Sequence, residues 1–179
     1  MLKLTIVQPE LYNDVLNEFT PSRFYKIQLE HSLVSLSKWE SNWKKPFLSN
    51  DEKTLEETID YIKCMTITQN VPDEAYRYIS DYQYSQILEY IRSERTATTL
   101  PSRKSTGRRE VITSELIYYW MVVLNIPFEC QKWHISRLLT LINVCDIKNS
   151  PPKKMSKKEI ATRNAELNAA RRKSLGSQG

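Results

Sequence analysis

The chain has 179 residues, of which 40% are hydrophobic and 26% charged, and its formal net charge is +5. A chain of this size and mixture can bury a core without disulfide or metal staples. Its most apolar run, Leu116 to Phe128, is interrupted by Asn125 and Pro127 and is shorter than the roughly 20 residues of a membrane span. We therefore expect a core helix there and no membrane partner.

The charge is unevenly distributed. From Ile147 onward there are nine basic and two acidic residues, a net +7, which leaves about −2 for the preceding residues. This distribution indicates a near-neutral globule with a basic tail. The three cysteines, Cys64, Cys130 and Cys145, are odd in number and far apart, so we expect free thiols in a reducing compartment.

The first 28 residues predict a β or irregular element (1–28). Leu2 to Val7 alternates between apolar and polar side chains, and Phe24 to Leu29 does so in part, so the two segments are expected to pair. Between them, Tyr12 to Phe19 has a helical option. No secretory signal is expected, because the apolar start reaches Pro9 after a few residues.

Residues 29–149 predict a helical core domain. Leu29, Leu33, Leu36 and Trp39 follow helical spacing, in a helix that should end before Pro46. Two capping boxes predict the next helix starts, since a Ser can cap the amide three residues later. They are Ser49-Asn50-Asp51-Glu52 and Ser80-Asp81-Tyr82-Gln83.

The second half of this domain predicts a loop followed by a helical hairpin. Ser93 to Arg109 is polar and predicts a solvated loop. Thr113 or Ser114 can cap a helix that Pro127 ends, and a second helix is expected from about Glu129 to Asn149. The short connection between them implies an αα-hairpin at the centre of the core.

The last segment, 150–179, predicts a basic helical tail. Pro151-Pro152 interrupts the chain, and the capping box Ser156-Lys157-Lys158-Glu159 begins a helix to about Arg172. Because isolated helices this polar are marginal in water, we expect it to extend the body or to order on a partner. A protein partner is favoured over nucleic acid and over a purely solvated tail.

Catalytic patterns are absent from the sequence. No P-loop, GxSxG or HExxH occurs, so we predict a non-enzymatic protein without cofactor. Cys130 and His134 are four residues apart, but a metal site would need further ligands, so packing is the favoured interpretation. Glu30-His31 is read in the same way, with His31 on the polar side of a helix.

Three segments of the chain resemble the tail assembly chaperones of long-tailed, siphovirus-type bacteriophages of Gram-positive hosts. The strings that carry the resemblance are Leu29–Ser41 with Lys45–Leu48, Ile117–Leu141, and Pro151–Asn168 with the basic end. The similarity covers most of the chain from about Leu29.

Taken together, the predicted elements indicate a mainly α fold, a helical bundle with a short N-terminal β element and a basic C-terminal helical tail. The resemblance adds a chaperone role. Such proteins coat the tape-measure protein in the host bacterial cytoplasm until tail tube protein replaces them, and they are usually absent from the mature virion. Self-association is a further possibility, and many are made in two lengths by ribosomal frameshifting.

A holdase needs an exposed apolar surface rather than catalytic residues. The predicted partner-binding residues are Trp39, Trp43, Phe47, Leu48, Lys153, Lys154, Arg163, Arg171, Arg172 and Lys173. Two other functions remain open at this point. One is a structural tail or head–tail connector protein that stays in the virion, and the other is a basic nucleic-acid-binding factor, which the tail would serve.

Overall fold

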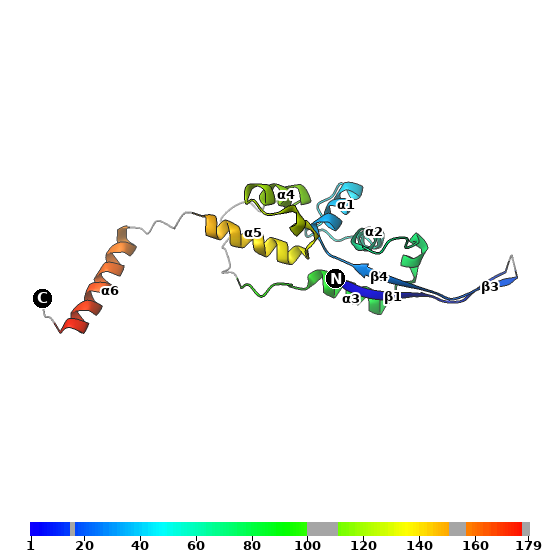
Figure 1. Ribbon diagram of the computed structural model, residues 1–179, viewed down its shortest axis with the longest axis horizontal. Helices are drawn as coiled ribbons and strands as arrows, with labels where there is room; N and C mark the ends of the chain where they lie inside the picture. Colours follow the sequence, from blue (N-terminus) through cyan, green and yellow to red (C-terminus); the bar gives the residue numbers. More distant parts are fainter. Residues whose placement is uncertain (15–16, 100–110, 151–156, 177–179) are drawn as a thin grey trace. The chain divides into compact units, whose positions relative to one another are not determined.

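The computed structural model describes residues 1–14, 17–99, 111–150 and 157–176 (Figure 1). The polypeptide forms two compact units, Met1–Ile147 and Lys148–Gly179. The first unit packs helices against a short N-terminal β element, and the second carries one basic helix. The predicted fold class, mainly α with an N-terminal β element and a basic helical tail, is confirmed.

The β element is an antiparallel ribbon of β1 (Leu2–Gln8) and β4 (Arg23–Leu29), and the predicted pairing of these segments is confirmed. One face of the ribbon packs on the helices through Ile6, Ile27 and Leu29, which are fully buried. The opposite face is exposed, as expected from the two-residue period of a strand. This alternation makes one face of the ribbon part of the core.

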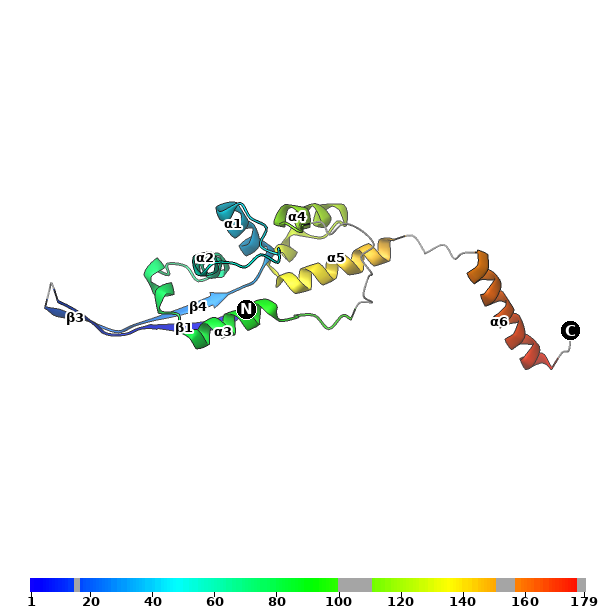
Figure 2. The same cartoon turned by 180° about the vertical axis from the view of Figure 1, so that it is seen from behind.

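A short hairpin extends the ribbon, and the helical option for this segment is wrong. β2 (Leu11–Asn13) and β3 (Glu18–Thr20) pair with each other, and the rings of Tyr12 and Phe19 lie 4.8 Å apart across them. Asn17 adopts a left-handed φ of 52° at the turn, a conformation that Asn tolerates better than most residues. In both views the ribbon and hairpin run outward from the helices of this unit (Figure 2).

The first helix, α1 (Leu33–Trp43), starts four residues later than its apolar spacing predicted. Leu29 belongs to β4, and Ser32 caps the helix by accepting the Ser35 amide. The helix ends before Pro46 as predicted, with Lys44 in the left-handed region at φ 54°.

The second helix, α2 (Leu55–Met65), does not use the predicted capping box at Ser49. Thr54 and Glu57 cap it instead, with the Thr54 amide donating to Glu57 Oε2 at 2.8 Å. Both segments have the required spacing, but Lys45 Nζ also binds Glu57, at 2.6 Å. The Ser49 hydroxyl donates to the Pro46 carbonyl, so it serves a turn.

The next elements are a 3₁₀ turn, η1 (Asp73–Tyr78), and helix α3 (Asp81–Arg92). The predicted capping box at Ser80 and Gln83 is confirmed. Residues 93–99 have no regular structure, and the rest of the predicted polar loop, 100–109, lies outside the described residues.

The predicted hairpin consists of α4 (Ser114–Val123), a 3₁₀ turn η2 (Phe128–Lys132), and α5 (Ile135–Asn149). Thr113 caps α4, as predicted. The second helix starts later than predicted, because the chain first forms a bridge between Ser32 and His134. The Ile135 amide donates to the His31 carbonyl at 2.7 Å, which ties the start of α5 to the start of α1.

The second unit contains α6 (Lys157–Leu175), close to the predicted span. From Ile160 to Gly176 every described side chain on it is exposed. The predicted proline break and the Ser of its capping box lie outside the described residues.

Candidate partner-binding surface

The outer face of α4 carries an exposed apolar row. Ile117 and Met121 point into the core and are fully buried. On the other side of the same helix, Tyr119 is 61% exposed, Val122 59% and Val123 55%. Residues three and four apart share a face of a helix, so these three side chains form one continuous row.

The row extends onto the neighbouring turn. Phe128 in η2 is 54% exposed, and its ring lies 6.4 Å from that of Tyr118 on α4. Because Tyr118 directly precedes Tyr119 in α4, a fourth exposed apolar side chain lies near the row. A contiguous exposed apolar patch of this kind typically marks a binding surface, whereas single exposed apolar residues are common on any protein.

A hollow of about 340 Å³ adjoins the row between α4 and α5. Its lining residues are Trp120, Val123, Leu124, Ile142, Asn143 and Asp146. Because Val123 belongs to both the row and the hollow, the two form one surface. We name the residues Tyr119, Val122, Val123 and Phe128, together with this hollow, the α4 surface.

Both ends of α4 are held firmly in place. At its start, the buried Glu40 carboxylate accepts the Ser114 amide at 2.7 Å and the Phe47 amide at 2.8 Å. At its end, Asn125 adopts a left-handed φ of 53°, and the Ile126 amide donates to the Met121 carbonyl at 2.8 Å. A fixed helix presents its side chains without an ordering cost on binding.

The predicted apolar patch at the end of α1 is only partly exposed. Trp39 is 1% exposed, and its indole Nε1 donates to the Glu57 carbonyl at 2.8 Å. Phe47 is also buried and stacks on Tyr61, with ring centroids 3.8 Å apart. The expectation that these two side chains lie on the surface is therefore wrong, because the chain between α1 and α2 folds over them.

The other two residues of that patch are half-buried. Trp43 donates to Asp60 Oδ2 at 2.9 Å, and Leu48 packs against the core. Trp43 lines a hollow with Leu55 and Ile59 of α2, so it retains some accessible surface.

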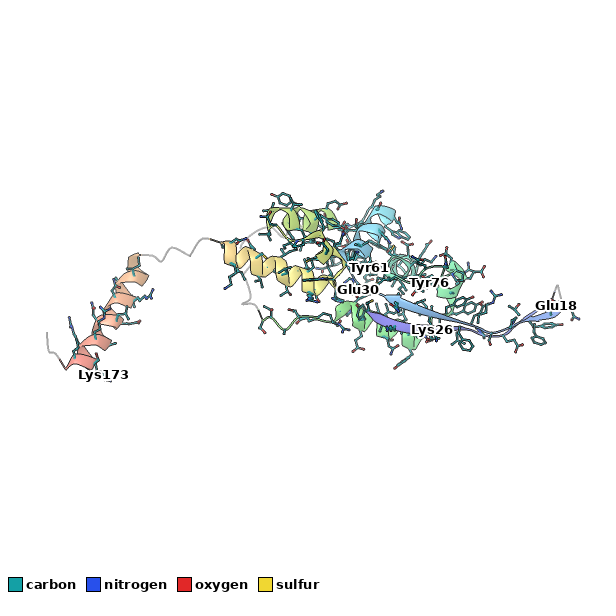
Figure 3. All side chains as sticks on the ribbon, in the orientation of Figure 1. Glu18, Lys26, Glu30, Tyr61, Tyr76 and Lys173 are labelled. Carbon is teal, nitrogen blue, oxygen red and sulfur yellow. The ribbon has the colours of Figure 1, made fainter. Side chains whose placement is uncertain are left out.

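The predicted basic residues lie on α6 or outside the described residues. Arg163, Arg171, Arg172 and Lys173 are exposed on that helix, and Figure 3 shows Lys173 near its end. Lys153 and Lys154 fall in the part that is not described.

Two buried histidines lie at the centre of the first unit. His31 is 2% exposed, and its ring centroid lies 5.0 Å from that of His134. His31 Nδ1 is hydrogen-bonded to the Tyr61 hydroxyl, and Figure 3 shows Tyr61 inside the body. Burial, reinforced by His134, lowers the pKa of His31 to about 3. The expectation that His31 lies on a polar helix face is wrong.

The second histidine acts as a structural link. His134 Nε2 lies 3.1 Å from the Tyr90 carbonyl, and a carbonyl can only accept, so Nε2 carries the proton. Its Nδ1 is 2.8 Å from the Ser136 hydroxyl. Burial lowers the pKa of His134 as well. The neutral ring thus joins the end of α3 to the start of α5.

The described residues contain no group of three His, Cys, Asp or Glu side chains placed to hold a metal ion. In the same part of the chain, no helix is both long and apolar enough to cross a membrane. Comparison of the chain with protein-family models, curated proteins and solved structures gave no match.

The α4 surface was missed from the sequence, although a signal was present. The run from Leu116 to Val123 is apolar on all sides of the helix. A helix that is apolar all round needs cover on both faces. Because the core covers only one face of α4, the apolar side chains on its other face are exposed.

Proposed function

We propose that the protein is a phage tail assembly chaperone that binds the tape-measure protein and keeps it soluble during tail morphogenesis. The observation that supports this best is the exposed apolar row of Tyr119, Val122 and Val123. In this role the protein is non-enzymatic, works in the host bacterial cytoplasm and leaves before the virion is complete. The resemblance of its sequence segments to tail assembly chaperones motivates the same proposal.

The α4 surface suits an amphipathic helix as its ligand. A helix offers apolar side chains at one-turn intervals, and such helices dock into grooves through these anchors. Here Val123 lines the hollow together with Trp120 and Ile142, so an incoming side chain can enter between α4 and α5. Tyr119 and Phe128 supply the aromatic area that typically dominates such contacts.

The small size of the surface favours weak, repeated binding. Stable interfaces commonly bury about 800 Å² on each partner, far more than one row of three side chains and one ring can provide. Weak binding fits a holdase, because tube subunits must later displace it. Several copies along a long helical ligand would together mask its apolar stripe.

The test is co-expression with the tape-measure protein of the same phage, followed by pull-down and measurement of soluble tape-measure protein. The variant is Tyr119→Gln with Val123→Gln, and the matched control is Tyr82→Gln, whose tyrosine is 72% exposed on α3. We expect the double variant to lose the soluble complex and the control to retain it. Both variants should keep the wild-type helical content, since all three residues are exposed.

Two results would contradict the proposal. A complex that survives in the double variant would exclude the α4 surface as the binding site. No complex with the wild-type chain, combined with its presence at fixed stoichiometry in purified virions, would favour a structural tail or head–tail connector protein.

A further inference from the structure

A second apolar ridge lies on α2, separate from the α4 surface. Leu55 is 68% exposed and Ile59 is half-buried one turn later. Two hollows of about 320 Å³ each include both residues in their linings. One hollow continues to Trp43 and the other to Tyr84 on α3. We name Leu55, Ile59 and these two hollows the α2 ridge.

The surroundings of the α2 ridge are acidic. Residues 51–81 contain eight acidic and three basic residues, a net −5. Glu56 and Asp60 line one hollow, and Asp81 lines the other. Two of the three bases also line the hollows: Lys63, which is paired with Asp73 at 3.2 Å, lines the first, and Arg77 lines the second. The net charge of the segment is still −5. The ridge therefore suits a ligand that is both apolar and positively charged.

The basic helix α6 has this chemistry. Ile160 and Leu167 are seven residues apart, which places them on one face, roughly 10 Å from each other along the axis. Arg171 lies one turn beyond Leu167 on the same face, and Arg172 and Lys173 complete the basic last turn. Both apolar side chains are 45% exposed. A helix with so little apolar surface is marginal unless a partner packs against it.

We propose that α6 of one copy docks on the α2 ridge of a second copy, so that the chain self-associates through its basic tail. Leu55 and Ile59 would receive Ile160 and Leu167, while Glu56 and Asp81 would face Arg171 and Arg172. The complementary charges select a second copy as the occupant, since the chain carries both the acidic ridge and the basic helix. Nucleic acid would leave Ile160 and Leu167 without apolar contacts. This proposal does not rest on the chaperone function.

The test uses charge reversal in the full-length chain and molar mass from analytical ultracentrifugation over a range of concentrations. The ridge variant is Glu56→Lys with Asp81→Lys, and the tail variant is Arg171→Glu with Arg172→Glu. A matched control is Glu115→Lys with Glu129→Lys. These acids also lie in first helical turns, but they line neither hollow. Each sample is measured before and after nuclease treatment and checked for an unchanged melting temperature.

We expect the wild-type chain and the control to associate in low salt, and each reversed variant to do so at least about tenfold more weakly. An equimolar mixture of the ridge and tail variants should associate again. In the mixture the reversed ridge meets the reversed tail, and the native ridge of one variant meets the native tail of the other. A tail that merely folds on its own chain could not produce this recovery.

Three outcomes would overturn the proposal: a wild-type chain that stays monomeric at every concentration, reversed variants that associate like the wild type, or a mixture that remains monomeric. Association that disappears with nuclease treatment would overturn it as well, and would favour nucleic-acid binding by α6. None of these results bears on the α4 surface, which the pull-down with tape-measure protein tests separately.

Discussion

Mild acid should destabilise the protein through His31. The folded state holds the pKa of this imidazole at about 3, because the ring is buried beside His134. In the unfolded chain His31 has its ordinary pKa of 6.5. The unfolded state therefore binds the proton more readily. The contribution of His31 to stability is fully present above pH 6.5 and is lost as the pH falls from there toward 3.

The magnitude follows from the two pKa values. One pKa unit corresponds to about 1.4 kcal/mol. Between about pH 7 and pH 5 the free energy of unfolding should fall by roughly 2 kcal/mol on account of His31 alone. Because the ring is 2% exposed, solvent screening does not reduce this figure much. The lowered pKa of His134 acts in the same direction.

Urea denaturation at several pH values between 7 and 5 measures this effect, with His31→Gln as the comparison. The variant should be less stable at pH 7, because Tyr61 loses its imidazole partner, but its stability should depend less on pH than that of the wild type. Glu57 does not interfere in this window. Its pKa is lowered by the hydrogen bond from Lys45, so its stabilisation is lost only below its ordinary pKa of 4.5. Equal losses in the two proteins between pH 7 and 5 would refute the reasoning.

Three further predictions concern stability and are measured by chemical denaturation. Lys44→Gly should stabilise the protein by roughly 0.5–1 kcal/mol, because Lys44 adopts a left-handed φ of 54° that glycine reaches without strain. The control is Ser41→Gly, which should destabilise the protein because this residue lies inside α1. Glu40→Gln should lower the free energy of unfolding by roughly 1–3 kcal/mol, since the buried carboxylate accepts hydrogen bonds from two backbone amides. The exposed Glu115→Gln is the control, and an equally small effect of both substitutions would contradict a stabilising role of Glu40. Trp39→Ala should lower the free energy of unfolding by roughly 3–5 kcal/mol, because it removes a buried side chain from the core. Unchanged stability together with lost partner binding would instead support the surface role predicted from the sequence.

The sequence predicted those elements whose signals are local. The alternation in β1 and β4 and the capping box at Ser80 each depend on a few neighbouring residues, and each was confirmed. The prediction that the capping box at Ser49 starts a helix was wrong, because an equally good capping box begins five residues later at Thr54. Lys45, twelve residues before Glu57, helps to hold Glu57 in the second one. Spacing alone cannot choose between two local signals when a tertiary contact decides.

The candidate site was harder to predict, because exposure depends on how the elements pack. Trp39 was expected at the surface as part of the partner-binding patch of a chaperone, but Lys53 lies over its ring and that of Phe47, at 6.0 and 4.7 Å. Tyr119 lies in an apolar segment and was not predicted as a binding residue, yet it is exposed. His31 was read as polar because its partners Tyr61 and His134 lie 30 and 103 residues away along the chain.

The ribbon of β1 and β4 with its outer hairpin has a consequence for aggregation. A long open strand edge can template the addition of strands from other molecules. Here the hairpin strands have three residues each and form a separate sheet, and Pro9 and Pro21 lie between the two ladders. Proline has no amide hydrogen, so the edge is interrupted at these positions. The protein can therefore expose Tyr12 and Phe19 at the end of a ribbon without offering an uninterrupted edge for fibril growth.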